Sequence, residues 1–173
     1  MSLVERSVPV IRGTLSPGVA GTRQTLALMR DLARSGAADP VVRDRALLIL
    51  RSSSVADHDY AGELKALFEF VRDRVRFTRD PVDVETLQIP RRTLEVLAGD
   101  CDDKATLLVA LLRAVGNPAE LRYRAIGTSR PQFSHVYVVA RLGGTLIAMD
   151  PTRRSTPIGW QYPQPRALED FAA

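Results

Sequence analysis

The sequence contains very little cysteine and histidine. Cys101 is the single cysteine among 173 residues, and His58 and His135 are the two histidines. One cysteine excludes a disulfide within the chain and a zinc or iron–sulfur site held by several cysteines. A chain of this length buries about 70% of its extended-chain surface on folding, so neither is needed for stability. We therefore expect no metal and no cofactor.

Long apolar runs are also absent. The longest, residues 107–112, is far shorter than the roughly 20 residues of a membrane-spanning helix. The first residues, Met1 to Glu5, lack a basic segment followed by an apolar core, so no secretion signal is predicted. We expect a cytoplasmic protein that does not act on a membrane.

The positive charge is modest and dispersed. The net charge of +4 divides into +2, −2 and +4 over residues 1–60, 61–120 and 121–173. Basic and acidic residues mostly alternate, as in Arg43-Asp44-Arg45, which is typical of a solvated helix face. A nucleic-acid binder is the less favoured alternative, and it would show a steep loss of affinity with salt. We expect no nucleic-acid partner.

The first two thirds of the chain have the periodicity of helices. Apolar residues at steps of three and four predict the following helices: 22–33, 40–51, 59–76, 91–98 and 101–115. Gly99 is expected to end the fourth helix and Asp100 to cap the fifth, which Gly116-Asn117-Pro118 ends.

After Pro118 the apolar residues alternate, which predicts strands. The expected strands are 121–126, 134–142 and 145–149, with Gly143-Gly144 as a two-residue hairpin turn between the last two. Residues 152–173 contain three prolines and are expected to be irregular. Helices followed by an antiparallel sheet define an α+β fold, here expected as a single domain over residues 1–173.

Cys101 is the first candidate for chemistry. If Asp100 is the N-cap, Cys101 is the first helical residue, where free amide groups and the helix dipole favour a thiolate. Asp102 and Asp103 would oppose ionisation, but on a helix they are expected about 100° and 200° away from Cys101. The alternative is that Cys101 is a small buried apolar residue.

His135 and Asp150 are the second candidate pair. A two-residue turn at 143–144 places Asp150 opposite Tyr137 and makes it a diagonal neighbour of His135, within reach of the imidazole. A carboxylate there would fix the tautomer of the imidazole and favour its charged form. The alternative is a strand-end histidine and a turn-forming aspartate, and a one-residue shift of the turn would separate the pair.

These residues occur within a longer pattern. The pattern comprises Gly99-Asp-Cys-Asp-Asp-Lys-Ala105, Gly116-Asn-Pro-Ala119, Ser134-His-Val-Tyr-Val138 and Met149-Asp-Pro-Thr152. It resembles the core of the transglutaminase-like superfamily, in particular its small bacterial or prophage members. The strand bearing His135 departs from many relatives, since it has Val-Tyr where they have Ala-Trp after the histidine.

The resemblance implies a papain-like α+β core. Cys101 would then accept the acyl group, His135 would take and return the proton of the thiol, and Asp150 would orient the imidazole. It also divides the chain into a helical half (1–80), a catalytic core (81–152) and a tail (153–173). For the oxyanion, the candidate donors are the Cys101 amide and the side-chain amide of Gln88.

These residues lead to a functional hypothesis. We expect a cysteine acyl-transferase or hydrolase that attacks amide bonds of a peptide or protein substrate through a thioester. The alternative is an inactive binding or assembly module that uses the basic C-terminal third and the tail around Trp160. A cysteine sealed beneath that tail, with no cleft, would favour the alternative. His58 is expected to be solvated and without a role.

Overall fold

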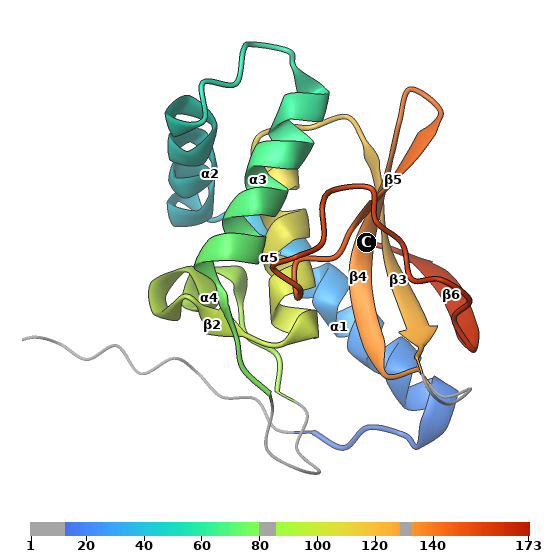
Figure 1. Cartoon of the computed structure of the whole chain (residues 1–173). Coiled ribbons are helices and arrows are strands. Elements are labelled where there is room, and N and C mark those ends of the chain that lie inside the picture. The colour runs from blue at the N-terminus through green and yellow to red at the C-terminus, as the bar shows by residue number, and fades with distance from the viewer. Residues whose placement is uncertain (1–12, 80–85, 129–132) are drawn as a thin grey trace, which may run out of the picture.

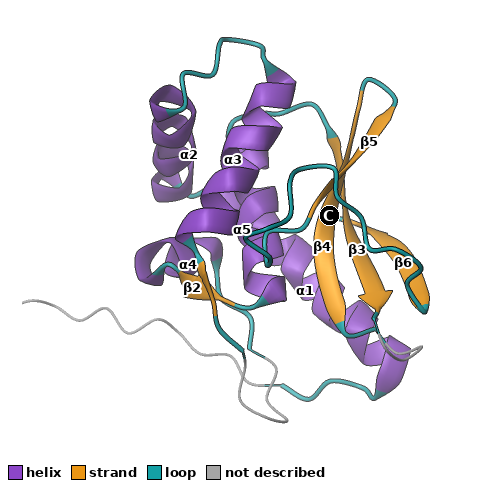
Figure 2. Cartoon of the chain, in the orientation of Figure 1, coloured by secondary structure: helices purple, strands orange, loops and turns teal. Residues whose placement is uncertain are grey.

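The helices gather on one side of an antiparallel sheet (Figures 1 and 2). The computed structural model describes residues 13–79, 86–128 and 133–173. The helices are α1 (Gly18–Ala37), α2 (Pro40–Ser52), α3 (Tyr60–Arg74), α4 (Pro90–Val96) and α5 (Cys101–Ala114). The strands are β1 (Arg76–Phe77), β2 (Ala98–Gly99), β3 (Glu120–Gly127), β4 (His135–Leu142), β5 (Thr145–Met149) and β6 (Ala167–Ala172). The predicted α+β class is confirmed.

The hairpin register agrees with the sequence prediction. The strand order in the four-stranded sheet is β5-β4-β3-β6, and β4 pairs with β5 from Val138↔Met149 to Leu142↔Thr145. Gly143 and Gly144 form the turn with φ of 56° and 83°. Both values lie in the left-handed region that a two-residue hairpin turn of this kind requires. The register therefore brings Asp150, just beyond β5, level with the first residues of β4.

The prediction of an irregular tail is wrong for residues 167–172. They form β6, which pairs with β3 from Arg122↔Ala172 to Gly127↔Ala167. Arg124 of β3 binds Asp170 through two hydrogen bonds of 2.6 and 2.7 Å. β6 was missed because its alternation is weak and its pairing partner lies more than 40 residues away in sequence.

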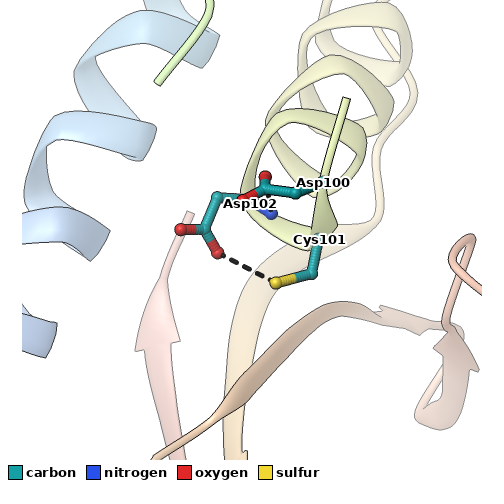
Figure 3. A group of neighbouring side chains, drawn as sticks. All are labelled: Asp100, Cys101 and Asp102. Atoms are coloured by element: carbon teal, nitrogen blue, oxygen red, sulfur yellow. Dashed lines mark hydrogen bonds between the residues drawn. The ribbon is translucent and has the colours of Figure 1, made fainter. Parts of the chain in front are cut away.

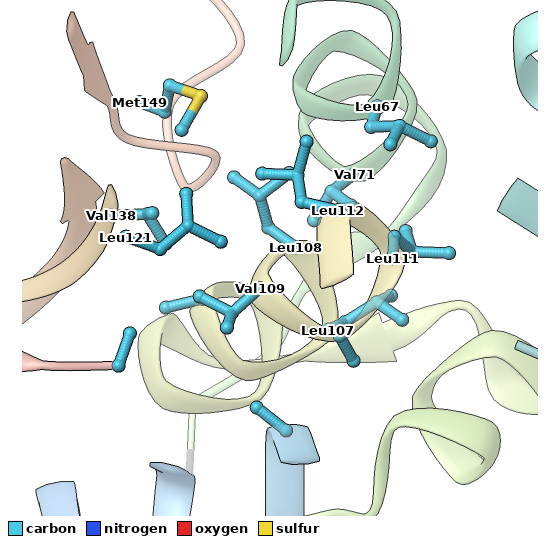
Figure 4. Close-up of a cluster of buried hydrophobic side chains, with 14 of the residues drawn as sticks. Leu67, Val71, Leu107, Leu108, Val109, Leu111, Leu112, Leu121, Val138 and Met149 are labelled. Atoms are coloured by element: carbon cyan, nitrogen blue, oxygen red, sulfur yellow. The ribbon is translucent and has the colours of Figure 1, made fainter. Parts of the chain in front are cut away.

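Helix α5 forms the centre of the hydrophobic core. Every residue from Asp102 to Leu112 is buried, and the helix contacts α1, α3 and β4. Figure 4 shows its leucines between the side chains of Leu67 and Val71 on α3 and those of Leu121, Val138 and Met149 on the sheet side. This packing fixes the position of the α5 N-terminus, where Cys101 lies. No described helix is both long and apolar enough to cross a bilayer.

The contact between α1 and α4 depends on a glycine. Gly36 of α1 packs on the ring of Pro90, and a Cβ built at Gly36 would lie 2.4 Å from Pro90 Cγ. We expect Gly36→Ala to lower the free energy of unfolding by about 1–3 kcal/mol, because overpacking outweighs the gain in helix propensity. Urea denaturation measures this change, with the exposed neighbour Ser35→Ala as the control. A stabilised Gly36→Ala variant would contradict the prediction.

Candidate active site

The N-terminus of α5 is held by a capping box. The Asp100 carboxylate accepts hydrogen bonds from the amides of Asp102 (3.0 Å) and Asp103 (3.2 Å). In return the Asp103 carboxylate accepts one from the Asp100 amide at 3.4 Å. Asp100 is therefore the N-cap, as the sequence predicts, and Cys101 is the first residue of the helix.

The Cys101 thiol is directed at a carboxylate. Cys101 is half-buried, and its Sγ donates to Asp102 Oδ1 at 3.4 Å (Figure 3). The expectation that Asp102 points away is wrong, since its side chain folds back over the first turn. Burial raises the pKa of the Cys101 thiol well above its ordinary value, and the charges of Asp102 and Asp100 add to this effect. A hydrogen bond from the Val136 backbone acts in the opposite direction.

The expected thiolate is therefore not the form that this arrangement favours. Charge–dipole interactions at a helix terminus contribute roughly 0.3–2 kcal/mol. At Cys101 the loss of hydration and two nearby carboxylates outweigh that contribution. In the described arrangement Cys101 is a protonated thiol near neutral pH.

The structure brings His135 and Asp150 into contact. His135 Nε2 lies 2.9 Å from Asp150 Oδ2. Asp150 is 2% exposed, and its other oxygen accepts from the backbone amide (3.0 Å) and hydroxyl (2.7 Å) of Thr152. Burial acts to raise the pKa of Asp150, but His135 and then Thr152 outweigh it and hold this pKa below its ordinary value. Asp150 is thus ionised, and the remaining His135 nitrogen, Nδ1, is left to exchange a proton.

Aromatic residues surround the His135 imidazole. Tyr162 meets it edge-on at 5.4 Å between ring centroids, and Tyr137 stacks at 6.0 Å. Trp160 packs on Tyr162 at 4.7 Å. The segment between β5 and β6 thus passes beside β4 (Figure 1). Its Tyr162 packs against the His135 imidazole. Sequence reasoning missed Tyr162: the aromatic spacing of the tail indicates packing, but not against which residue.

Cys101 and His135 line one pocket of about 410 Å³. Asp100, Asp102 and residues 133–136 form one part of its wall. The opposite part comes from the start of α1 and the residues before it: Leu15, Ser16, Gly18, Gly21, Thr22, Thr25. The helical half of the chain therefore contributes directly to the site.

Gln88 is bound away from the thiol. Its Nε2 donates to Ala98 O (3.2 Å) and to Asp103 Oδ2 (2.7 Å), and its backbone amide donates to Asp103 Oδ1 (2.7 Å). Both side-chain hydrogens are engaged, and Gln88 braces the first turn of α5 through Asp103. Its role as an oxyanion donor stays a prediction that requires these bonds to break.

His58 and the acidic residues next to Cys101 are two further groups with possible ligand atoms. His58 is exposed in the turn between α2 and α3, where it meets Tyr60 edge-on at 6.1 Å. Asp100, Cys101 and Asp102 are the group of described residues whose ligand atoms lie within 4.8 Å of one another, as a metal site would require. Their contacts serve the helix cap and the thiol, as described above.

A family profile matches most of this architecture. The profile of the transglutaminase-like superfamily matches residues 50–151, more than half of the chain. The chain belongs to this superfamily. The matched stretch runs from the end of α2 to the residue after Asp150 and so includes Cys101 and His135. The curated proteins contain no match to this transglutaminase-like chain.

Two solved structures resemble this transglutaminase-like chain in part. A candidate protease from Parabacteroides distasonis superposes with a TM-score of 0.56 at 14% identity, covering 82% of this chain and 27% of that one. A candidate cysteine protease from Cytophaga hutchinsonii gives a TM-score of 0.49 at 23% identity, covering 64% and 38%. The chain thus spans well under half the length of either protein. At 14% identity, the likeness to the Parabacteroides distasonis protein shows a similar fold and nothing more.

Proposed function

We propose that this chain is a cysteine acyl-transferase or hydrolase that acts on amide bonds of a peptide or protein substrate. The observation that carries the proposal is the 2.9 Å contact between buried Asp150 and His135. His135 lines the same pocket as Cys101. An ionised carboxylate on one imidazole nitrogen makes the other nitrogen a better proton acceptor. A thiol at that pocket is the matching nucleophile.

The first half-reaction would form a thioester. The Cys101 proton passes to His135 Nδ1, and Asp150 stabilises the imidazolium that results. The sulfur then attacks the amide carbonyl, so that a C–S bond forms and the carbonyl oxygen becomes an oxyanion. The candidate oxyanion donor of the first α5 turn is the Cys101 amide, because the amides of Asp102 and Asp103 already donate to the Asp100 carboxylate.

The second half-reaction would release the acyl group. Collapse of the oxyanion breaks the C–N bond, and His135 gives its proton to the leaving amine. Water or a second amine then attacks the thioester, with His135 removing the proton of the attacking group. Cys101 leaves as a thiolate, takes back that proton and is again a thiol. Water gives hydrolysis, whereas an amine gives transfer.

The accessibility of Cys101 supports the enzyme over the binding module. A binding module that had lost its chemistry would tolerate a cysteine sealed beneath the tail. Instead, the tail residue Tyr162 covers the His135 ring, and Cys101 is half-buried and lines the pocket. A substrate carbonyl can therefore approach the sulfur from the pocket.

Turnover with a broad substrate tests the proposal. We expect the protein, incubated with casein and a fluorescent primary amine, either to release new amino groups or to incorporate the amine. Cys101→Ala should show neither reaction while keeping the circular dichroism spectrum of the parent. Equal turnover by Cys101→Ala, or none by the parent with casein and with a mixed peptide library, would overturn the proposal.

A further inference from the structure

We propose that Asp102 is a positioning residue of this site, whose carboxylate holds the Cys101 thiol by its proton in the resting state. The thiol must leave Asp102 before it can pass that proton to His135. The inference deepens the proposed function and rests on it for the role of Cys101 as nucleophile. In the resting state this one hydrogen bond holds the Cys101 thiol.

Three acids share the first turn of α5, but they serve different partners. Asp100 caps the helix amides, and Asp103 binds Gln88 and the Asp100 amide. Asp102 is the one that accepts from the sulfur, at 3.4 Å from Sγ to Oδ1 (Figure 3). The thiol contact thus belongs to Asp102 alone among the described acids of this turn.

Burial makes this contact effective. Asp102 is 8% exposed, so its charge is poorly screened by water where it faces the sulfur. A carboxylate stabilises the S–H form as a hydrogen-bond acceptor and destabilises the S⁻ form as a like charge. Both effects keep the proton on Cys101. When the thiol turns away from Asp102 the hydrogen bond is lost and the repulsion weakens with distance.

Other groups face the sulfur from the neighbouring elements. Asp100 adds negative charge from the same turn, and the Val136 backbone of β4 opposes it by favouring the thiolate. Tyr162 of the tail is near enough to interact with Cys101 electrostatically, and His135 lines the same pocket. Rotation of the Cys101 side chain away from Asp102 and towards His135 would convert the resting site into the reactive one. The step moves one proton from Sγ to the imidazole and needs no co-reactant.

Alkylation of Cys101 measures this contact directly, because the chain has no other cysteine. We expect the rate of reaction with iodoacetamide, followed by intact mass against pH, to have its midpoint above the roughly 8.5 of an ordinary cysteine. In Asp102→Asn the midpoint should fall by at least about one pH unit, which makes alkylation at pH 7 about tenfold faster. Asp103→Asn is the charge control, since it removes a negative charge from the same turn and keeps the Asp102 carboxylate that accepts from the sulfur.

Several results would overturn the proposal. The first is an alkylation midpoint of the parent protein at or below that of an ordinary cysteine. The second is an unchanged midpoint in Asp102→Asn. The third is a fall of the midpoint in Asp103→Asn equal to that in Asp102→Asn, which would indicate a general charge effect. If Asp102→Asn does not fold, Asp102→Ser replaces it, and the parent titration alone still decides the first point. The casein assay separates the two proposals: turnover without the alkylation shift overturns the role of Asp102, whereas the shift without turnover overturns the proposed function.

Discussion

His135→Ala lowers the rate of amide-bond cleavage by about a thousandfold or more, the expected loss for a general acid–base group of a catalytic triad. The loss is large here because the pKa of the Cys101 thiol is raised, so few molecules carry a thiolate without help. In the proposed mechanism His135 takes the proton of the thiol, and the contact with Asp150 holds the imidazole in place. Single-turnover release of amino groups at pH 7 measures the effect.

His58→Ala is the matched control for this prediction. His58 is exposed in the α2–α3 turn and does not line the Cys101 pocket. Its replacement should leave the rate within a factor of two. A rate for His135→Ala within threefold of the parent would contradict the assignment of His135 as the proton acceptor.

The free energy of unfolding of the parent protein, measured relative to that of Lys104→Met, rises between about pH 8 and pH 10.5. Lys104 is 1% exposed, and its ammonium donates to Val75 O at 2.6 Å. Burial lowers its pKa from 10.5 to about 8, against the opposing charges of Asp150 and Asp73. Between these two values the unfolded chain binds more protons than the folded one, so raising the pH favours folding.

The size of this effect follows from the pKa difference. The cost of burying the Lys104 charge is fully present below about pH 8 and is lost above pH 10.5, a change on the order of 3 kcal/mol. Urea denaturation of both proteins at pH 7.5 and 10.5 measures it, because the two proteins differ only at Lys104 and carry the same other groups that titrate in this range. A difference between the two proteins that stays constant, or that moves in the opposite direction, would contradict the prediction.

Local rules predicted the parts of the site that depend on nearby residues. Asp100 directly precedes Cys101, so the helix start could be predicted from capping preferences alone. The turn at Gly143-Gly144 fixed the register of β4 and β5, and with it the approach of Asp150 to His135. In both cases the deciding residues lie within a few positions of a turn or cap.

The parts that were missed depend on side-chain rotation or on distant residues. Asp102 folds back onto the sulfur, which helix geometry alone does not predict because it fixes the direction of Cβ and not of the carboxylate. Tyr162 reaches His135 only because the tail crosses β4. Gln88 binds Asp103, which is 15 residues away, and no local rule predicts a pairing over that distance.

The stretch that matches the superfamily contains the two residues that meet at the pocket. The profile of the superfamily covers residues 50–151, and within that stretch the structure places Cys101 and His135 on one pocket. The start of α1 lies outside the matched stretch, yet it forms part of the pocket wall.

Detection of an acyl group on Cys101 tests the central claim most directly. The protein is incubated briefly with a mixed peptide library, quenched in acid, and analysed by intact mass and peptide mapping. The account predicts an adduct on Cys101 that hydroxylamine removes, as it does a thioester, that is absent from Cys101→Ser and that decays faster when a primary amine is present. Turnover of the peptides without any adduct on Cys101, or with the same adduct in Cys101→Ser, would contradict it.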